Sequence, residues 1–154
     1  MSNKKVIGFT GTRFLDGKAS GAVQKVLVSH LNSNQWVVGD ARGVDSLVRS
    51  YGDIYHISLR VFRVPLNPEP WDFANRSLEM VKYLASVDGT LVAFPNKPCP
   101  NCCVPCAKPK GGGSGTWLTI AAAKHQGLEI EIHPLTESLI SPSWLSQRQL
   151  RLFE

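Results

Sequence analysis

The sequence has no uninterrupted apolar run long enough to cross a lipid bilayer, and its first residues contain no apolar core of a signal peptide. Charged residues are also scarce, at 19% of the 154 residues, whereas hydrophobic residues make up 43%. This balance is typical of a globular chain and excludes a disordered one, and the length corresponds to about one domain with its own hydrophobic core. We therefore expect a cytoplasmic protein that does not associate with a membrane.

Several patterns of known nucleotide-binding proteins and hydrolases are missing as well. Neither a Walker phosphate loop nor a dinucleotide-binding fingerprint of the proper spacing is present. There is no Gly-x-Ser-x-Gly elbow and no His-Glu-x-x-His pair, and the histidines do not converge in the sequence on any nucleophile. His125 and His133 are therefore interpreted as surface or strand-end residues.

The chain alternates short apolar runs, typical of buried strands, with stretches of helical periodicity. Strands are expected at 5–10, 36–39, 59–64, 89–94 and 128–133, with helices between them at 19–31, 44–51, 72–87 and 116–126. This rhythm predicts an α/β fold, namely a Rossmann-like three-layer domain with a mostly parallel sheet of about five strands. The domain is expected to span residues 1–135, with a cysteine-rich inserted loop at 95–113 and a tail at 136–154.

Three turns rich in glycine or polar residues are expected at the carboxyl ends of the strands. They are Thr-Gly-Thr-Arg at 10–13, Gly-Asp-Ala-Arg-Gly at 39–43 and Gly-Gly-Gly-Ser-Gly-Thr at 111–116, the last of which opens a helix. Glycine lets backbone amides approach a phosphate closely, and a helix N-terminus adds free N–H groups and its dipole. The net charge of +5 also suits an anionic partner. The turns therefore predict a phosphate-bearing ligand, although glycines that merely build tight turns would give the same pattern.

The order of these motifs resembles a known superfamily. The chain carries Thr-Gly-Thr-Arg at 10–13, Gly-Asp-Ala-Arg-Gly-Val-Asp at 39–45, Ala-Asn-Arg at 74–76, Leu-Val-Ala-Phe at 91–94 and Gly-Ser-Gly-Thr-Trp at 113–117. Over about residues 4–135 this set resembles the SLOG superfamily, which includes DprA-like DNA-processing proteins, YspA-like proteins, LOG-type phosphoribohydrolases and molybdenum-cofactor carriers. The resemblance implies a Rossmann-like domain that binds a nucleotide or a nucleotide derivative, often as a homodimer. It implies a ligand site lined by Gly11, Thr12, Arg13, Gly39, Arg42, Gly43, Asp45, Asn75, Arg76, Gly112, Gly113, Ser114, Gly115 and Thr116.

One departure from the superfamily affects the expected chemistry. LOG-type enzymes have a glutamate after the glycine-threonine turn, which cleavage of the N-glycosidic bond requires, whereas here the turn is followed by Trp117, Leu118 and Thr119. Asp45 and Glu79 are the only nearby substitutes, and we interpret them as a ribose or arginine partner and an exposed helix residue. Binding or sensing is therefore favoured over catalysis. A LOG-type hydrolase with a relocated acid and a carrier of a pterin cofactor are the alternatives.

All four cysteines lie in one eight-residue window, at Cys99, Cys102, Cys103 and Cys106. Two adjoining Cys-x-x-Cys motifs provide four thiolates, which is the number that a tetrahedral zinc site needs. Zinc sites usually separate the two motifs by a dozen or more residues, so a single site would require a tight reversal of the chain. A site shared with a second chain, an iron–sulfur cluster and plain reduced thiols are the alternatives.

The tail ends in a second recognisable motif, Gln-Leu-Arg-Leu-Phe at 149–153. It resembles the pentapeptide with which bacterial proteins bind the DNA polymerase sliding clamp, and only Arg151 departs from the usual form. Leu152 and Phe153 would fill an apolar pocket of the clamp, Leu150 would pack at the pocket edge, and Gln149 would set the register.

The alternative for the tail is an amphipathic helix whose apolar side chains, including Trp144 and Leu145, pack back onto the domain. The clamp motif predicts a bacterial or phage protein that acts in DNA replication, repair, processing or defence. Single-stranded DNA is a further hypothetical partner, because Arg76, Lys108 and Lys110 are expected near the ligand site, although no basic groove with interleaved aromatic residues is evident.

Overall fold

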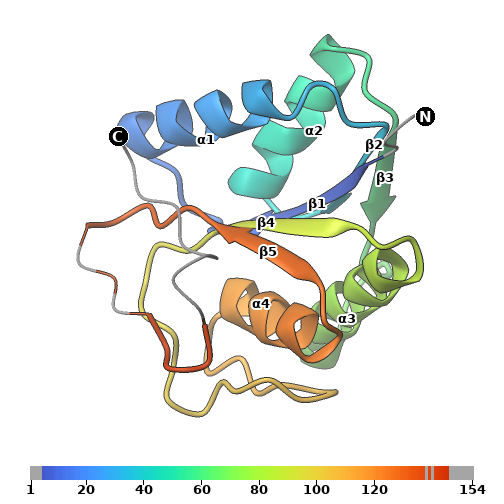
Figure 1. Ribbon diagram of the computed structural model, residues 1–154. Helices are drawn as coiled ribbons and strands as arrows, with labels where there is room; N and C mark the ends of the chain where they lie inside the picture. Colours follow the sequence, from blue (N-terminus) through green and yellow to red (C-terminus); the bar gives the residue numbers. More distant parts are fainter. Residues whose placement is uncertain (1–4, 138, 140, 146–154) are drawn as a thin grey trace.

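Five strands and four helices alternate along the chain in the computed structural model, which describes residues 5–137, 139 and 141–145 (Figure 1). In chain order the elements are β1 (Val6–Gly11), α1 (Gly17–Ser29), β2 (Gln35–Gly39), α2 (Val44–Ile54), β3 (Leu59–Phe62), α3 (Pro70–Ser86), β4 (Thr90–Phe94), α4 (Gly115–His125) and β5 (Glu129–Ile132). None of the described helices has the length and apolar character needed to span a membrane.

The five strands form one sheet in the order β3-β2-β1-β4-β5, and every neighbouring pair is parallel. Helices α1 and α2 cover one face of the sheet, while α3 and α4 cover the other (Figure 1). The α/β fold of Rossmann-like, three-layer type is thus confirmed, and the sheet is wholly parallel in the described part of the chain.

Strand β4 shows why a parallel sheet with two covered faces has continuously apolar strands. Leu91, Val92, Ala93 and Phe94 are all fully buried. Successive side chains point to opposite faces, so Leu91 and Ala93 pack with α3 and α4, whereas Val92 and Phe94 pack with α1 and α2. The sheet therefore separates two hydrophobic clusters, and its carboxyl edge is left as the place where polar residues gather.

Local sequence signals position the helices that reach this edge. Helix α3 begins at Pro70, and Glu69 and Asp72 form a reciprocal capping box around its start. Helix α4 ends at His125, and Gly127 follows with φ of +76°, as expected of a glycine after a helix C-terminus. Both helices thus have defined ends, and their N-terminal turns lie at the carboxyl edge of the sheet.

Candidate functional site

A cavity of about 660 Å³ opens at the carboxyl edge of the sheet, beside the neighbouring ends of β1 and β4. The strand order reverses at this point, because β2 and β3 lie on one side of β1 whereas β4 and β5 lie on the other. Such a switch point leaves a crevice between the loops that follow the two central strands, and it is the usual ligand site of open parallel sheets. The cavity lies where the sequence predicts a ligand.

The glycine-rich loop, residues 111–116, lines the cavity and leads into α4. Gly112 and Gly113 have φ values of +59° and +90°, which other residues rarely adopt. Ser114 is the N-cap of α4, since its Oγ accepts a hydrogen bond from the backbone N–H of Trp117 at 3.1 Å. The first two N–H groups of the helix have no partner within it, so they are free to bind an anion.

Lys97 and Trp117 fasten the glycine-rich loop to the chain that follows β4. The ammonium group of Lys97 donates to the carbonyl of Gly113 at 2.9 Å, and the indole N–H of Trp117 donates to the carbonyl of Lys97 at 2.7 Å. Trp117 is almost completely buried, whereas Lys97 lines the cavity. The loop is therefore held by the core on one side and has a positive charge beside it on the other.

Thr12 connects the loops that follow β1, β2 and β4. Its backbone N–H donates to the carbonyl of Phe94 at 3.3 Å, and its carbonyl accepts from the N–H of Val44 at 3.0 Å. Gly43 has φ of +76°, and a Cβ at this position would overlap the backbone carbonyl of Thr12. Only glycine therefore allows the β2–α2 loop to lie against the β1–α1 loop.

Charged side chains from the β2–α2 loop, α2 and α3 form a network beside the cavity. The carboxylate of Asp40 pairs with the guanidinium of Arg76 and also accepts a hydrogen bond from the N–H of Val64 at 3.0 Å. Burial alone would raise the pKa of Asp40, but these hydrogen bonds lower it overall. Arg49 donates to the carbonyl of Gly39 at 2.8 Å and so ties α2 to the end of β2. Gly39 has no room for a side chain, because a Cβ would lie 2.6 Å from Asp45 Oδ2.

Asp45, in the first turn of α2, is a buried carboxyl group that faces the cavity. Its Oδ2 accepts a hydrogen bond from the N–H of Ala41 at 3.2 Å, while Oδ1 has no hydrogen-bond partner among the described residues. No fully buried side-chain oxygen in the described residues lacks a partner, so Oδ1 is not completely buried. Burial raises the pKa of Asp45 to about 6, although the nearby Arg76 counteracts the shift.

The structure brings most of the predicted ligand residues together. Those that line the cavity are Gly11, Thr12, Arg13, Asp45, Arg76, Gly112, Gly113, Ser114, Gly115 and Thr116. The other four lie outside its lining. Gly39 is packed against the side chains of Asp45 and Arg76, and Gly43 lies behind the β1–α1 loop. Arg42 lines a neighbouring hollow, and Asn75 is exposed on α3.

Sequence reasoning missed the aromatic part of the cavity. Phe14 and Phe73 both line it, and the guanidinium of Arg13 lies 5.1 Å from the ring centroid of Phe73. Phe73 fits the apolar periodicity of α3, so on that pattern it is expected in the core. Its position in the first turn of a helix after the proline-rich segment 65–70 was the signal that it lies at the edge of the sheet instead.

The four cysteines differ in exposure, since Cys102 is exposed, Cys103 is buried, and Cys99 and Cys106 are half-buried. No three His, Cys, Asp or Glu side chains are arranged to hold a metal ion among the described residues, which include Cys99, Cys102, Cys103 and Cys106. Cys103 is buried, and its thiol donates to the carbonyl of Trp117 at 3.4 Å. Burial raises the pKa of Cys99, and it raises the pKa of Cys103 to about 12. A four-cysteine zinc site stays a prediction, and within this loop Cys103 is the side chain that points into the core.

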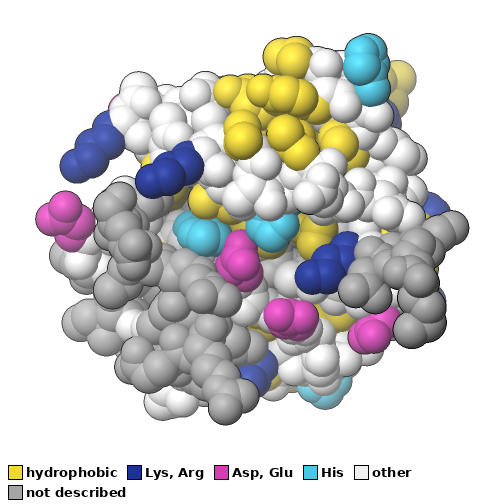
Figure 2. Space-filling model, turned by 45° about the horizontal axis from the view of Figure 1, so that its top comes forward, with side chains coloured by type: hydrophobic (Ala, Val, Ile, Leu, Met, Phe, Trp, Pro, Cys, Tyr) yellow, Lys and Arg dark blue, Asp and Glu magenta, His cyan; other side chains and the backbone are white. Residues whose placement is uncertain are grey.

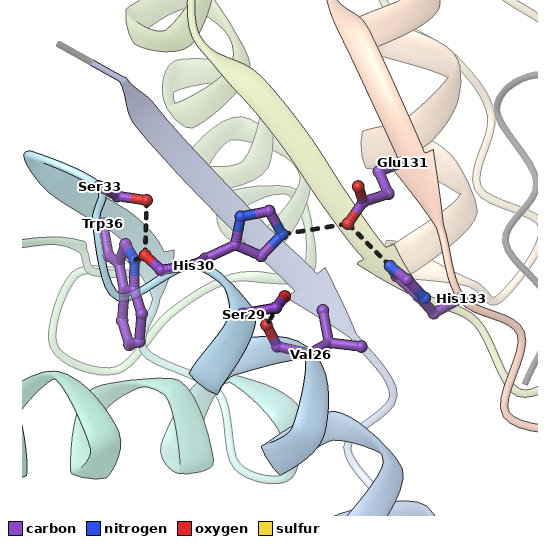
Figure 3. Close-up of polar contacts among 7 residues, drawn as sticks. All are labelled: Val26, Ser29, His30, Ser33, Trp36, Glu131 and His133. Atoms are coloured by element: carbon purple, nitrogen blue, oxygen red, sulfur yellow. Dashed lines mark hydrogen bonds and ion pairs between the residues drawn. The ribbon is translucent and has the colours of Figure 1, made fainter. Parts of the chain in front are cut away.

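Two of the histidines converge on one carboxylate, which sequence reasoning also missed. Nε2 of His30 and Nε2 of His133 lie 3.1 Å and 2.8 Å from the same oxygen, Oε2 of Glu131 (Figure 3). On the molecular surface, two histidine side chains flank an acidic one beside a group of hydrophobic side chains (Figure 2). The two hydrogen bonds lower the pKa of Glu131. His133 is thus part of a cluster that joins the end of α1 to β5, whereas His125 is exposed as expected.

The tail returns to the domain before the clamp motif. Leu145 is buried in the cluster beneath α3 and α4, and the ring of Trp144 packs edge-on against Trp117 with centroids 6.1 Å apart. These contacts match the packing that the alternative interpretation of the tail expects of these two residues. The predicted clamp residues Gln149, Leu150, Leu152 and Phe153 lie outside the described residues.

No protein-family model, curated protein or solved structure matches this chain. The resemblance to the SLOG superfamily therefore rests on the sequence motifs and their order alone.

Proposed function

We propose that the cavity binds a nucleotide or a nucleotide derivative, with a phosphate group against the glycine-rich loop. The main support for this proposal is that residues 111–116 line a cavity at the switch point of the sheet and lead into the N-terminus of α4. Free N–H groups, the helix dipole and the hydroxyls of Ser114 and Thr116 all suit an anion at this position. Arg13 and Lys97 add positive charge to the lining.

In this proposal Asp45 and the aromatic side chains recognise the nucleoside. Oδ1 of Asp45 accepts a hydrogen bond from a ribose hydroxyl, and Phe14 or Phe73 provides the flat apolar surface against which a base packs. The protein acts as a binder or sensor, because no glutamate follows the glycine-threonine turn.

The test is calorimetric titration of the protein with nucleoside monophosphates, comparing wild type with Gly115→Val. A Cβ at Gly115 has open space around it, so the substitution leaves the fold intact while its side chain blocks the approach of a phosphate to the loop. The matched control is Gly21→Val. Gly21 also lies in a helix, α1, and a Cβ at this position also has open space around it. We expect at least a tenfold loss of affinity for Gly115→Val alone. The proposal is wrong if wild type does not bind, or if Gly115→Val and Gly21→Val bind with equal affinity.

A second candidate is hydrolysis of the N-glycosidic bond with Asp45 as the acid. Its support is that Asp45 faces the cavity and has a pKa of about 6, in the range in which a carboxyl group can donate a proton. The carboxyl proton would pass to the leaving base while water adds to the sugar, and the proton that this water gives up would return to the Asp45 carboxylate. Incubation with nucleoside monophosphates should then release free base, and Asp45→Asn should abolish the release. If nucleotide is bound but no base is released, the hydrolysis proposal is wrong and only the binding function is supported.

We further propose that the protein acts in DNA metabolism through the bacterial sliding clamp. The support is the motif at 149–153, which begins four residues after the buried Leu145 and so follows a segment that is anchored to the domain. Binding to a purified clamp should be in the micromolar range and should be lost in the double variant Leu152→Ala/Phe153→Ala. Equal binding by both proteins, or no binding by either, contradicts this part of the proposal. A mobility-shift assay at low salt tests single-stranded DNA separately.

A further inference from the structure

A second, shallower hollow adjoins the cavity on the far side of the β1–α1 loop. It is lined by Arg13, Phe14, Leu15, Asp16, Arg42 and Asn96. Arg13, Phe14 and Asn96 line the main cavity as well, so the two spaces share a wall. A ligand that fills the cavity can therefore extend across Arg13 and Phe14 without leaving the surface of the protein.

The second hollow combines an exposed aromatic ring with two arginines that have no acidic partner in the described part of the chain. Phe14 is 70% exposed, and the guanidinium of Arg42 lies 5.1 Å from the centroid of its ring. Among the described residues, neither Arg13 nor Arg42 has a carboxylate within 4 Å. Asp16 also lines the hollow, but its carboxylate accepts the N–H of Ala19 at 2.7 Å as the N-cap of α1. Unpaired guanidinium groups beside an aromatic ring are suited to a phosphate and a base.

The backbone holds these groups in place. The N–H of Phe14 donates to Oγ1 of the buried Thr12 at 3.1 Å, which fixes the turn that exposes the ring. Gly43 brings the β2–α2 loop against the same turn, and Arg42 is its neighbour in the sequence. The hollow is thus built by the contact between two loops.

We propose that this hollow binds the second unit of a ligand made of two nucleotides joined by a phosphate group. The first nucleotide occupies the cavity, Arg13 contacts the linking phosphate, and Arg42 and Phe14 hold the second unit. This inference rests on the proposed nucleotide-binding function and adds the class of ligand. Two nucleotides joined by a phosphate group occur both in a free dinucleotide and in a single strand of nucleic acid.

The test compares the affinities of two probes, adenosine monophosphate and the 5′-phosphorylated dinucleotide of two adenosines joined by a 3′–5′ phosphodiester. We expect wild type to bind the dinucleotide at least tenfold more tightly. Arg42→Gln should remove most of this difference and change the affinity for the monophosphate less than about twofold, because Arg42 does not line the cavity. The matched control is Lys25→Gln, which removes a positive charge from the exposed face of α1 and should retain the difference.

The outcomes separate the inference from the function on which it rests. Equal affinities for the two probes, or a similar loss of both in Arg42→Gln, overturn the second subsite while leaving nucleotide binding intact. If wild type binds neither the monophosphate nor the dinucleotide, both the second subsite and the proposed nucleotide binding are wrong. Oligonucleotides of increasing length identify the source of the ligand. An affinity that stops rising at two units supports a free dinucleotide, and one that continues to rise supports a single strand.

Discussion

Asp45 should make the protein less stable as the pH rises, because its carboxyl group is buried beside the cavity. Asparagine has nearly the same shape, keeps an oxygen that can accept the N–H of Ala41, and carries no charge at any pH. Asp45→Asn therefore isolates the cost of the charge from the contribution of packing. We expect the variant to be more stable than wild type near pH 8 and similar to it near pH 4.

The size and sign of the effect follow from the pKa. The pKa of Asp45 is about 6 in the folded protein, against an ordinary value of 3.8. This difference of about 2 pKa units corresponds to about 3 kcal/mol. Between these two values the folded protein binds more protons than the unfolded chain, so the free energy of unfolding falls as the pH rises through this window. Asp45→Asn should therefore gain up to about 3 kcal/mol over wild type between about pH 4 and pH 8.

The assay is urea denaturation of both proteins at several pH values. Other titrating groups are shared by the two proteins and cancel in the difference between their free energies of unfolding. If that difference is the same at every pH, or if Asp45→Asn becomes relatively less stable as the pH rises, the reasoning is refuted. A variant that is more stable but binds nucleotide weakly would show that the charge is retained for binding at the expense of stability.

Three further substitutions are each tested by denaturation with urea, two in the loops around the cavity and one in the histidine–glutamate cluster. Gly43→Ala should lower the free energy of unfolding by about 2 kcal/mol or more, because of its positive φ and the overlap with Thr12, and a neutral result would contradict the described contact between the loops. Ser114→Ala should cost about 1 kcal/mol by removing the cap of α4, whereas Ser114→Asp, which can also cap, should retain most of the stability. Glu131→Gln should cost about 2 kcal/mol near pH 6. Since the pKa of Glu131 is lowered, that difference should shrink as the pH falls below the ordinary glutamate pKa, and a constant difference would exclude the ionic contribution.

The order of strands and helices could be predicted because each element carries its own local signal. Apolar runs that end at glycine or proline mark the strands, and helical periodicity marks the helices. The ends of the elements were predicted less well, since they depend on individual capping residues. Helix α1 begins at Gly17, two residues before its apolar periodicity, because Asp16 caps it. Strand β3 ends at Phe62 rather than at residue 64, since the N–H of Val64 bonds to Asp40 instead of a neighbouring strand.

Features that depend on the strand order could not be predicted in the same way. His30 and Glu131 are 101 residues apart and meet because α1 ends beside β5. No local sequence pattern predicts that these two elements are neighbours. The position of Arg42 could not be predicted either, because it lies in one of the glycine-rich turns but lines the second hollow. The glycine-rich loop, by contrast, was predictable, because its glycines and the cap at Ser114 are local features.

Trp117 bears on which elements supply carboxyl groups to the cavity. In the family that the sequence resembles, hydrolytic members have a glutamate after the glycine-threonine turn, and this chain has Trp117 directly after Thr116. Trp117 is almost completely buried, and its indole N–H is bonded to the carbonyl of Lys97, so this position supports the loop instead of facing a ligand. Asp45 is then the only carboxyl group that lines the cavity among the described residues. Any proton transfer by an acidic side chain in this cavity must therefore come from Asp45, whose pKa of about 6 allows it to hold a proton in mildly acidic solution.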